Sequence, residues 1–133
     1  MNRYDLNFKQ SNLPAPKWVT GIYFLFDGDE IVYVGQSVDI MTRIGAHLRD
    51  KIFDSFNYIE CGLRDLNNLE ATYILELKPK YNTTLPKNDF WMSSNAIKQK
   101  HGIGKRDLKK IIKEEKIEFR DFLGVLYVKK GKK

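Results

Sequence analysis

The chain has 133 residues, of which 42% are hydrophobic, and Cys61 is its only cysteine. This composition suits one domain, or a small domain with an appendage; it argues against wholesale disorder, a disulfide, a structural zinc site and a membrane-spanning helix of ~20 apolar residues. The net charge of +6 is unevenly divided: residues 1–86 hold 9 Lys+Arg and 11 Asp+Glu, a net of −2, and residues 87–133 hold 14 and 6, a net of +8. The basic excess indicates a nucleic-acid or anionic-membrane footprint, or only a solvated surface.

Residues 1–17 are polar and end in Pro14-Ala15-Pro16, which predicts an extended N-terminal arm. The arm lacks the apolar stretch of a secretory signal. With the lone cysteine, this indicates a reducing intracellular setting. We therefore expect the cytoplasm of a bacterium or of a phage-infected host cell.

A short antiparallel hairpin is predicted next. Val19–Phe26 is rich in β-branched and aromatic residues, Asp27–Glu30 has turn chemistry, and Ile31–Val34 is the return strand. If the strands pair evenly about that turn, Tyr23 lies directly opposite Tyr33. Cross-strand neighbours share a face of the sheet, so the two phenol rings should meet.

A helix is predicted to follow the hairpin and to run to about Asp50, with Ser37 as its N-cap and Asp39 in its first turn. Its apolar arc consists of Ile40, Met41, Ile44 and Leu48. Arg43 and His47 are four residues apart at the edge of this arc, and they are therefore neighbours on one face.

A third strand over Phe56–Cys61 and a second helix over Leu66–Leu77 complete this part of the chain, and Pro79 ends the helix. The apolar stripe of the second helix consists of Leu66, Leu69, Tyr73, Ile74 and Leu77. Glu70 lies inside that stripe. A carboxylate on an apolar face is costly unless it is paired or bound to metal, so we expect either an ion pair, for example with Arg43, or a metal site.

The last third of the chain has its own pattern. Ser94–Gln99 and Arg106–Glu115 are predicted helices, and Glu118–Phe122 and Val125–Val128 are predicted strands of a hairpin. Two helices and a hairpin resemble a small helix-turn-helix with a wing.

Basic residues cluster around these helices and at the end of the chain, where they suit phosphate contacts. The DNA-binding candidates are Lys98, Lys100, Lys105, Arg106, Lys109, Lys110, Lys113, Lys129 and Lys130, with Lys132 and Lys133 behind them. Phe90 and Trp91 suit a stacking element or, as the favoured alternative, core packing of this segment.

An ordered set of motifs accompanies the order strand, strand, helix, strand, helix. Gly21-Ile22-Tyr23 lies on the first strand, and Tyr33-Val34-Gly35, followed by Gln36-Ser37, lies on the second. Arg43 and His47 come next, then the segments Leu69–Ile74 and Lys78–Asn82. One tripeptide alone would be a weak signal. The whole set, over roughly residues 20–85, resembles the GIY-YIG endonuclease family, and Val34 in place of isoleucine keeps the β-branched shape.

The resemblance implies an α+β fold: a small three-stranded antiparallel sheet flanked by helices over residues 18–86, followed by a basic DNA-binding tail, helical and wing-like, over residues 87–133. It implies that Glu70 holds one divalent ion, Mg²⁺ or Mn²⁺. The catalytic residues that it implies are Tyr23, Tyr33, Arg43, His47, Glu70 and Asn82.

The resemblance also implies roles for these residues. In the family the first tyrosine contacts the attacking water as general base or relay, which here is Tyr23. A phenol with its free pKa of about 10 is a poor base and needs a nearby cation to lower that pKa. Arg43 suits two phosphate oxygens, His47 suits the phosphate or a tyrosine, and Asn82 suits the phosphate or the glutamate.

Each residue also has a purely structural interpretation. Two strand tyrosines can simply pack, and an arginine on a helix edge is usually a surface residue. His47 suits a half-buried position beside the core, and Asn82 suits a turn after the helix. These alternatives stay open on the sequence alone.

The expected function is that of a divalent-metal-dependent DNA endonuclease. A phage or mobile-element homing role is favoured by the compact size and basic tail, and restriction and repair roles are open. The alternative is a non-catalytic DNA-binding or regulatory protein on the same scaffold, against which the retained polar set argues. DNA is the expected partner, with no membrane and no organic cofactor. No heptad zipper or long apolar edge is evident, so we expect a monomer, with dimerisation on DNA open.

Overall fold

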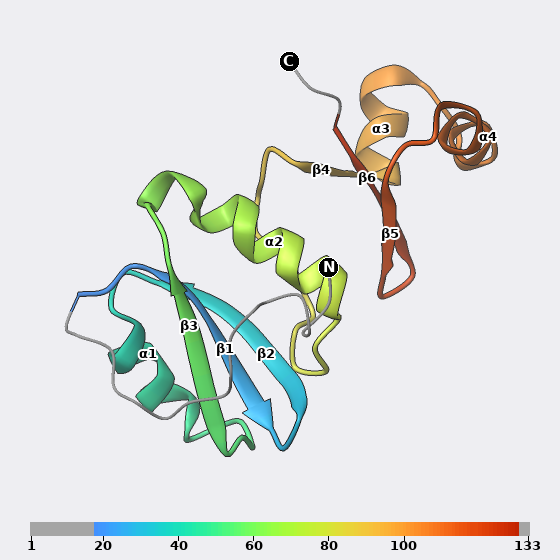
Figure 1. The fold of residues 1–133 in the computed structure, drawn as a ribbon. Helices are drawn as coiled ribbons and strands as arrows, with labels where there is room; N and C mark the ends of the chain where they lie inside the picture. Colours follow the sequence, from blue (N-terminus) through green and yellow to red (C-terminus); the bar gives the residue numbers. More distant parts are fainter. Residues whose placement is uncertain (1–17, 131–133) are drawn as a thin grey trace. The chain divides into compact units, whose positions relative to one another are not determined.

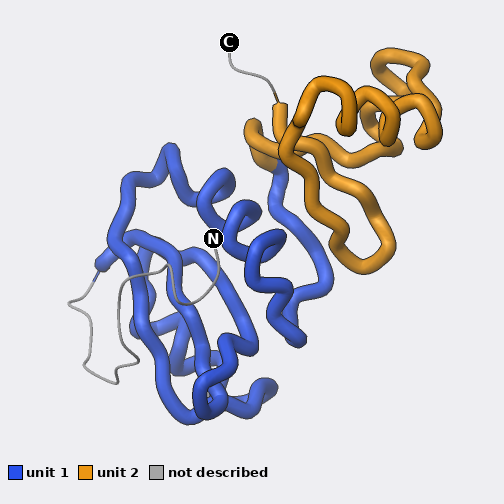
Figure 2. Tube along the Cα trace, turned by 45° about the vertical axis from the view of Figure 1, so that its right-hand side comes forward, with its two compact units in different colours: residues 1–87 blue, residues 88–133 orange. Residues whose placement is uncertain are grey.

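The computed structural model describes residues 18–130, and the chain divides into two compact units, residues 1–87 and 88–133 (Figures 1 and 2). The described residues form two three-stranded antiparallel sheets and four α-helices, which confirms the α+β class. The arm expected over residues 1–17, Lys132 and Lys133 lie outside the described residues. Between residues 18 and 130, none of the helices has the length and apolar character that crossing a bilayer requires.

The first unit is built on an antiparallel sheet in the order β2-β1-β3. Its elements are β1 (Gly21–Asp27), β2 (Glu30–Ser37), α1 (Ile40–His47), β3 (Ser55–Glu60), a short 3₁₀-helix (Leu63–Asp65) and α2 (Leu66–Leu77). Tyr23 and Leu25 of β1 form a buried cluster with α1, while Phe24 meets Tyr73 of α2 edge to face, with ring centroids 5.0 Å apart. Because successive strand residues face opposite sides, α1 and α2 cover opposite faces of the sheet (Figure 1).

The register between β1 and β2 corrects the expected one. Tyr23 pairs with Gly35 and Tyr33 pairs with Leu25, so the two tyrosines are not directly opposite. The hairpin closes on two residues rather than three, and a β-bulge within β1 shifts the pairing further. The tyrosines are nevertheless diagonal neighbours on one face, with ring centroids 6.1 Å apart.

Helix α1 is shorter than predicted at both ends. Its N-cap is Asp39 rather than Ser37, because Ser37 still belongs to strand β2. The Ser37 hydroxyl instead accepts a hydrogen bond from the Asp39 N–H at 2.9 Å, which closes the turn before the helix. The helix ends at His47 rather than Asp50, which leaves Leu48 exposed. Helix α2, in contrast, has the predicted bounds.

The second unit has a sheet in the order β4-β6-β5 with two helices. Its elements are β4 (Trp91–Ser93), α3 (Ser94–His101), α4 (Lys105–Glu115), β5 (Phe119–Phe122) and β6 (Val125–Lys129). Its core consists of Ile97, Leu108, Ile112, Leu126 and Val128. The sequence did not predict β4. Trp91 on that strand is buried, as core packing requires, and Phe90 is 42% exposed.

Local signals set the boundaries in this unit. The Ser93 hydroxyl accepts a hydrogen bond from the Ala96 N–H at 3.2 Å and so caps the start of α3. Gly102, with φ of 71°, ends that helix. Leu123 and Gly124 have φ of 49° and 83°, which gives the tight turn that joins β5 to β6.

Candidate active site

The candidate site lies along β2, the edge strand of the first sheet. Tyr33 faces the α1 side, and Val34 and Gln36 face the α2 side. A pocket of about 400 Å³ is lined by Tyr33, Lys51, Glu70, Tyr81, Asn82 and the loop 83–86. Residues from both faces of the sheet therefore meet in one pocket at this edge.

Three rings form a cluster beside the pocket. The Tyr23 hydroxyl is hydrogen-bonded to His47 Nε2 at 2.7 Å, and the Tyr33 ring lies 4.8 Å from the His47 ring and 6.1 Å from the Tyr23 ring. Tyr23 is 1% exposed and His47 is 5% exposed, whereas Tyr33 is half-buried and lines the pocket. Of the two tyrosines, Tyr33 is the one that solvent reaches.

Arg43 is exposed on α1 and lies close to these rings. Burial, and then the neighbouring Tyr33, raise the pKa of Tyr23 well above its ordinary value, although a hydrogen bond and the charge of Arg43 act in the opposite direction. The expected lowering of the Tyr23 pKa by a nearby cation is therefore wrong for the protein alone. Tyr23 is a neutral phenol that can donate a hydrogen bond.

The pKa of Tyr33 is also raised, first by burial and then by the charge of Glu70. Arg43 and a hydrogen bond with Tyr23 lower it in part. The hydroxyl groups of Tyr33 and Tyr23 and the imidazole of His47 thus form a continuous hydrogen-bonded chain that leads inward from the pocket.

Glu70 is half-buried at the rim of the same pocket. The Gln36 amide donates from Nε2 to Glu70 Oε1 at 2.6 Å and to Asn67 Oδ1 at 2.7 Å. Burial raises the pKa of Glu70, and the hydrogen bond from Gln36 opposes that rise. Within residues 18–130 the Glu70 carboxylate makes no ion pair, so the pairing with Arg43 that the sequence left open is not formed.

The donor set at Glu70 suits one hard cation. In the part of the chain that the structure describes, no three His, Cys, Asp or Glu side chains gather into a metal-binding group. Mg²⁺, however, is often held by one or two carboxylates together with waters and substrate phosphate. A half-buried carboxylate held by one neutral amide offers that arrangement, because a cation would compensate the charge that burial penalises.

Asn82 holds the edge of the sheet. Its buried side chain donates from Nδ2 to the Val34 carbonyl and accepts from the Val34 N–H at Oδ1, both at 2.9 Å. The Tyr81 N–H donates to the Val32 carbonyl at 3.0 Å. The segment after α2 is thereby fastened to β2. The amide of Asn82 is engaged with the backbone rather than with Glu70, contrary to one of its two expected contacts.

We expect Asn82→Ala to lower the free energy of unfolding by about 2–4 kcal/mol, because it leaves a buried N–H and a buried C=O of Val34 without partners. Urea unfolding followed by circular dichroism measures this loss. Thr83→Ala, at the exposed neighbouring residue, is the matched control and should change stability by less than about 0.5 kcal/mol. Equal stability of both variants would show that the clamp is unimportant.

The glycines of the two tripeptides have steric reasons. A Cβ on Gly35 would lie 2.4 Å from Cζ and from Oη of Tyr23, so the phenol ring lies directly against the Gly35 backbone. A Cβ on Gly21 would lie 2.1 Å from the carbonyl oxygen of Ile59 on β3. Gly35 therefore makes room for the Tyr23 ring, and Gly21 allows the close approach of β1 and β3.

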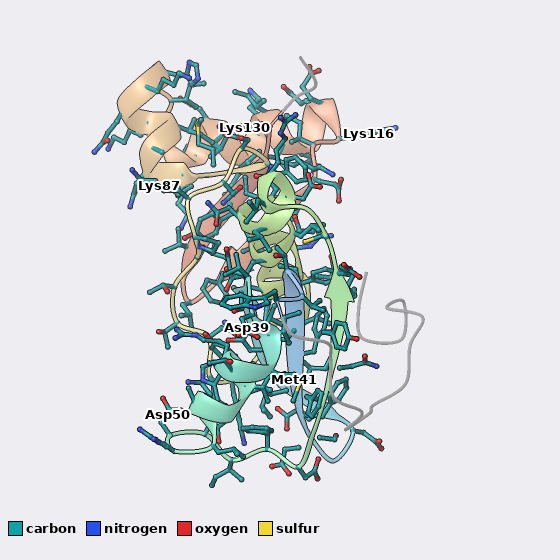
Figure 3. The ribbon with its side chains drawn as sticks, turned by 90° about the vertical axis from the view of Figure 1, so that its left-hand side faces the viewer. Asp39, Met41, Asp50, Lys87, Lys116 and Lys130 are labelled. Atoms are coloured by element: carbon teal, nitrogen blue, oxygen red, sulfur yellow. The ribbon has the colours of Figure 1, made fainter. Side chains whose placement is uncertain are left out.

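The sequence did not assign three residues that the structure brings to the site. Gln36 follows the second tripeptide on β2, and strand alternation places it toward α2, which could have indicated its contact with Glu70. Lys51 lies with Nζ 4.6 Å from the centre of the Tyr33 ring and 3.3 Å from Asp50 Oδ2. Lys51 and Asp50 lie just beyond the end of α1 (Figure 3), in an irregular segment that periodicity cannot describe.

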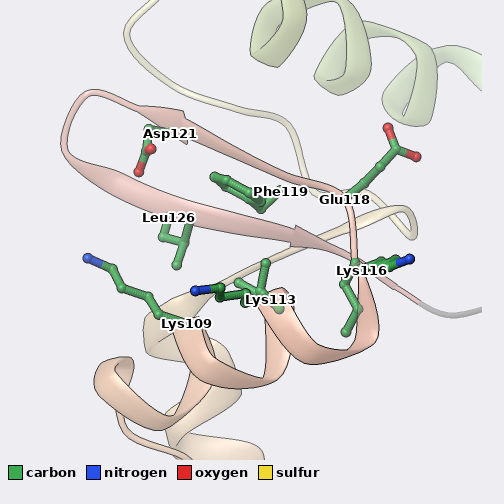
Figure 4. A pocket seen from close by; sticks show the side chains of 9 residues that line it. Lys109, Lys113, Lys116, Glu118, Phe119, Asp121 and Leu126 are labelled. Carbon is green, nitrogen blue, oxygen red and sulfur yellow. The ribbon is translucent and has the colours of Figure 1, made fainter.

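The basic residues proposed for DNA contact are all exposed in the second unit. They are Lys98, Lys100, Lys105, Arg106, Lys109, Lys110, Lys113, Lys129 and Lys130. A groove of about 680 Å³ separates α4 from the β5–β6 hairpin; Lys109 and Lys113 line its helical side and Asp121 lines its strand side (Figure 4). The helix thus presents a row of cations to solvent.

Comparison of the chain with protein-family models, with curated proteins and with solved structures found no match. What the site does has to follow from its own residues and their geometry.

Proposed function

We propose that the chain is a divalent-metal-dependent DNA endonuclease of the GIY-YIG type, acting in a mobile element, in restriction or in repair. The observation that carries the proposal is the half-buried Glu70 carboxylate, which has no ion-pair partner in the described chain and opens into a polar pocket beside Tyr33 and Lys51. A structural scaffold gains nothing from such a carboxylate, whereas a metal site needs one.

The remaining residues suit the hydrolysis of a phosphodiester. Arg43 is exposed, and its planar guanidinium can bridge two oxygens of the scissile phosphate. Lys51 places a second cation in the pocket. The hydroxyl of Tyr33 faces the pocket and suits the attacking water. A divalent cation at Glu70 would supply polarisation of the phosphate and stabilisation of the leaving 3′ oxygen.

The second unit suits the grip on DNA, and we interpret α3, α4 and the β5–β6 hairpin as a small helix-turn-helix with a wing. The first 86 residues carry a net charge of −2 and residues 87–133 carry +8, so the electrostatic attraction to phosphate resides in the second unit.

Replacing Lys109, Lys110 and Lys113 together by alanine should weaken duplex binding and make it less sensitive to salt. Each lost phosphate contact lowers the slope of log affinity against log salt by about 0.9. Fluorescence anisotropy with a labelled duplex at several salt concentrations measures both. The control is Lys78→Ala in the first unit, an exposed cation beyond α2, which should leave the slope unchanged. A triple variant with the wild-type slope would remove α4 from the interface.

One such site hydrolyses one phosphodiester at a time. The strands of a duplex are antiparallel, so one active site in one orientation cannot act on both. We therefore propose that a monomer nicks DNA first, and that a double-strand break needs dimerisation or a second binding event.

The experiment that tests the function is cleavage of end-labelled duplex, flap and junction oligonucleotides with Mg²⁺ or Mn²⁺. Strand scission that leaves a 5′ phosphate and a 3′ hydroxyl and disappears in EDTA supports the proposal, and the relative rates identify the preferred shape. Tight binding of all three substrates without scission would favour the alternative, a non-catalytic DNA-binding protein on this scaffold.

A further inference from the structure

His47 has one ring nitrogen that the site described above does not use. Its Nε2 is hydrogen-bonded to the Tyr23 hydroxyl at 2.7 Å, but its buried Nδ1 has no hydrogen-bond partner. The charged atom paired with this nitrogen is Asp50 Oδ1 at 3.7 Å, a distance too long for a formed hydrogen bond. A buried polar atom without a partner is costly, so the contact with Asp50 needs an explanation.

The surroundings of Nδ1 decide where the proton of His47 resides. Burial, and then the charges of Lys51 and Arg43, lower the pKa of His47, so the ring is neutral at pH 7 and has one N–H. Burial alone would raise the pKa of Asp50, but Lys51 and His47 hold it below its ordinary value, so this side chain is an ionised acceptor. A nitrogen lone pair facing a carboxylate is repelled, whereas an N–H is attracted.

The Asp50 side chain is 63% exposed and free to turn, while His47 is fixed between the two tyrosine rings. A small rotation of Asp50 brings its carboxylate to hydrogen-bonding distance of Nδ1. With the proton on Nδ1, Nε2 has only a lone pair, and the hydrogen bond with Tyr23 must therefore run from the tyrosine hydroxyl to His47.

We propose that Asp50 is a positioning residue that holds the proton of neutral His47 on Nδ1, so that His47 Nε2 is the inner acceptor of a proton relay entered through Tyr33. The relay rests on the proposed nuclease function. It also assigns the contact with the attacking water to Tyr33, since Tyr23 is 1% exposed and Tyr33 lines the pocket. This differs from what the family resemblance implies for Tyr23.

The proton transfers balance. The attacking water passes one proton to the Tyr33 oxygen as its own oxygen bonds to phosphorus. Tyr33 passes its hydroxyl proton to the Tyr23 oxygen, and Tyr23 passes its proton to His47 Nε2. The bond between phosphorus and the 3′ oxygen breaks, and that oxygen leaves with the electron pair and takes a proton from solvent. His47 then returns its extra proton along the same chain to solvent, and the Nδ1 proton remains with Asp50 throughout.

The direct test is the tautomer of His47 in the full chain, read from ¹H–¹⁵N correlations of the imidazole nitrogens at about pH 8, above the ordinary histidine pKa of about 6.5. The chain has two histidines, and the exposed His101 is an internal reference. We expect wild-type His47 as the Nδ1–H tautomer. Asp50→Asn should move it to Nε2–H, because the new amide can donate to Nδ1.

Two controls separate this effect from a general change of charge. Glu60→Gln removes a carboxylate at the exposed end of β3, and Lys51→Gln removes the ion-pair partner of Asp50. Both variants should keep the Nδ1–H tautomer. An Nε2–H tautomer in the wild type, or an unchanged tautomer in Asp50→Asn, would overturn the assignment whatever the protein cleaves.

Cleavage kinetics test the consequence. Asp50→Asn should lower kcat by at least about tenfold with KM within about twofold, because proton transfer and not substrate binding is affected. Asp50→Glu should recover part of kcat, and Glu60→Gln should match the wild type. Wild-type kcat in Asp50→Asn would overturn the role of Asp50. If the wild type cleaves nothing, the proposed function fails, and the tautomer still decides whether Asp50 positions His47.

Discussion

Replacing Glu70 by glutamine should lower the kcat of DNA cleavage by on the order of 10³ and leave duplex affinity within about twofold of the wild type. Glutamine keeps the size of the side chain and can still meet Gln36, but it removes the carboxylate that we assign to the metal. DNA affinity depends on the exposed cations of the second unit, which this change does not touch.

Single-turnover cleavage with Mg²⁺ and anisotropy with the same duplex measure the two effects of Glu70→Gln. Glu60→Gln, which removes an exposed carboxylate of β3, is the control and should cleave at the wild-type rate. Comparable Mg²⁺-dependent cleavage by Glu70→Gln would remove Glu70 from the metal site. A parallel loss of affinity would point to misfolding, which circular dichroism checks.

The second large effect concerns the fold around the tripeptides. Gly21→Ala and Gly35→Ala should each lower the free energy of unfolding by about 3 kcal/mol, near the upper end of the usual cost of overpacking. At Gly21 the added methyl meets the backbone oxygen of Ile59 at 2.1 Å, which can yield only if β1 and β3 separate. At Gly35 it meets the Tyr23 ring at 2.4 Å and would displace the hydroxyl from His47.

Gly45→Ala is the matched control for both changes. Gly45 lies on an exposed part of α1, and an added Cβ meets nothing within 4 Å, so alanine should stabilise the protein by about 0.5–1 kcal/mol through its higher helix propensity. Urea unfolding of the three variants gives the values. A loss below about 1 kcal/mol at both Gly21 and Gly35 would contradict the close contacts described above.

The sequence predicted those parts of the fold that depend on periodicity. The apolar stripe of α2 identified the helix with its observed bounds and placed Glu70 against the protein rather than in open solvent. Alternation and turn chemistry identified the strands on both sides of the first hairpin. These signals are local, so no knowledge of the remaining chain was needed.

The errors and omissions come from long-range packing. The bulge in β1 changes the partner of Tyr23, and turn composition alone does not reveal an inserted residue. Asn82 was placed at the phosphate or the glutamate, but its amide pairs with Val34, 48 residues away along the chain. Lys51 and Asp50 lie in an irregular segment, where their contacts with Tyr33 and His47 depend on how the helix packs on the sheet.

The central claim is that one metal-dependent site breaks phosphodiester bonds, and a time course on supercoiled plasmid tests it most directly. The wild type is incubated with Mg²⁺ or Mn²⁺ and, in parallel, with EDTA, and the DNA forms are separated on a gel. We predict nicked circles that accumulate before any linear DNA, at a rate proportional to protein concentration, and no change in EDTA. Plasmid that stays supercoiled with both metals, or that is cut equally in EDTA, would contradict the claim.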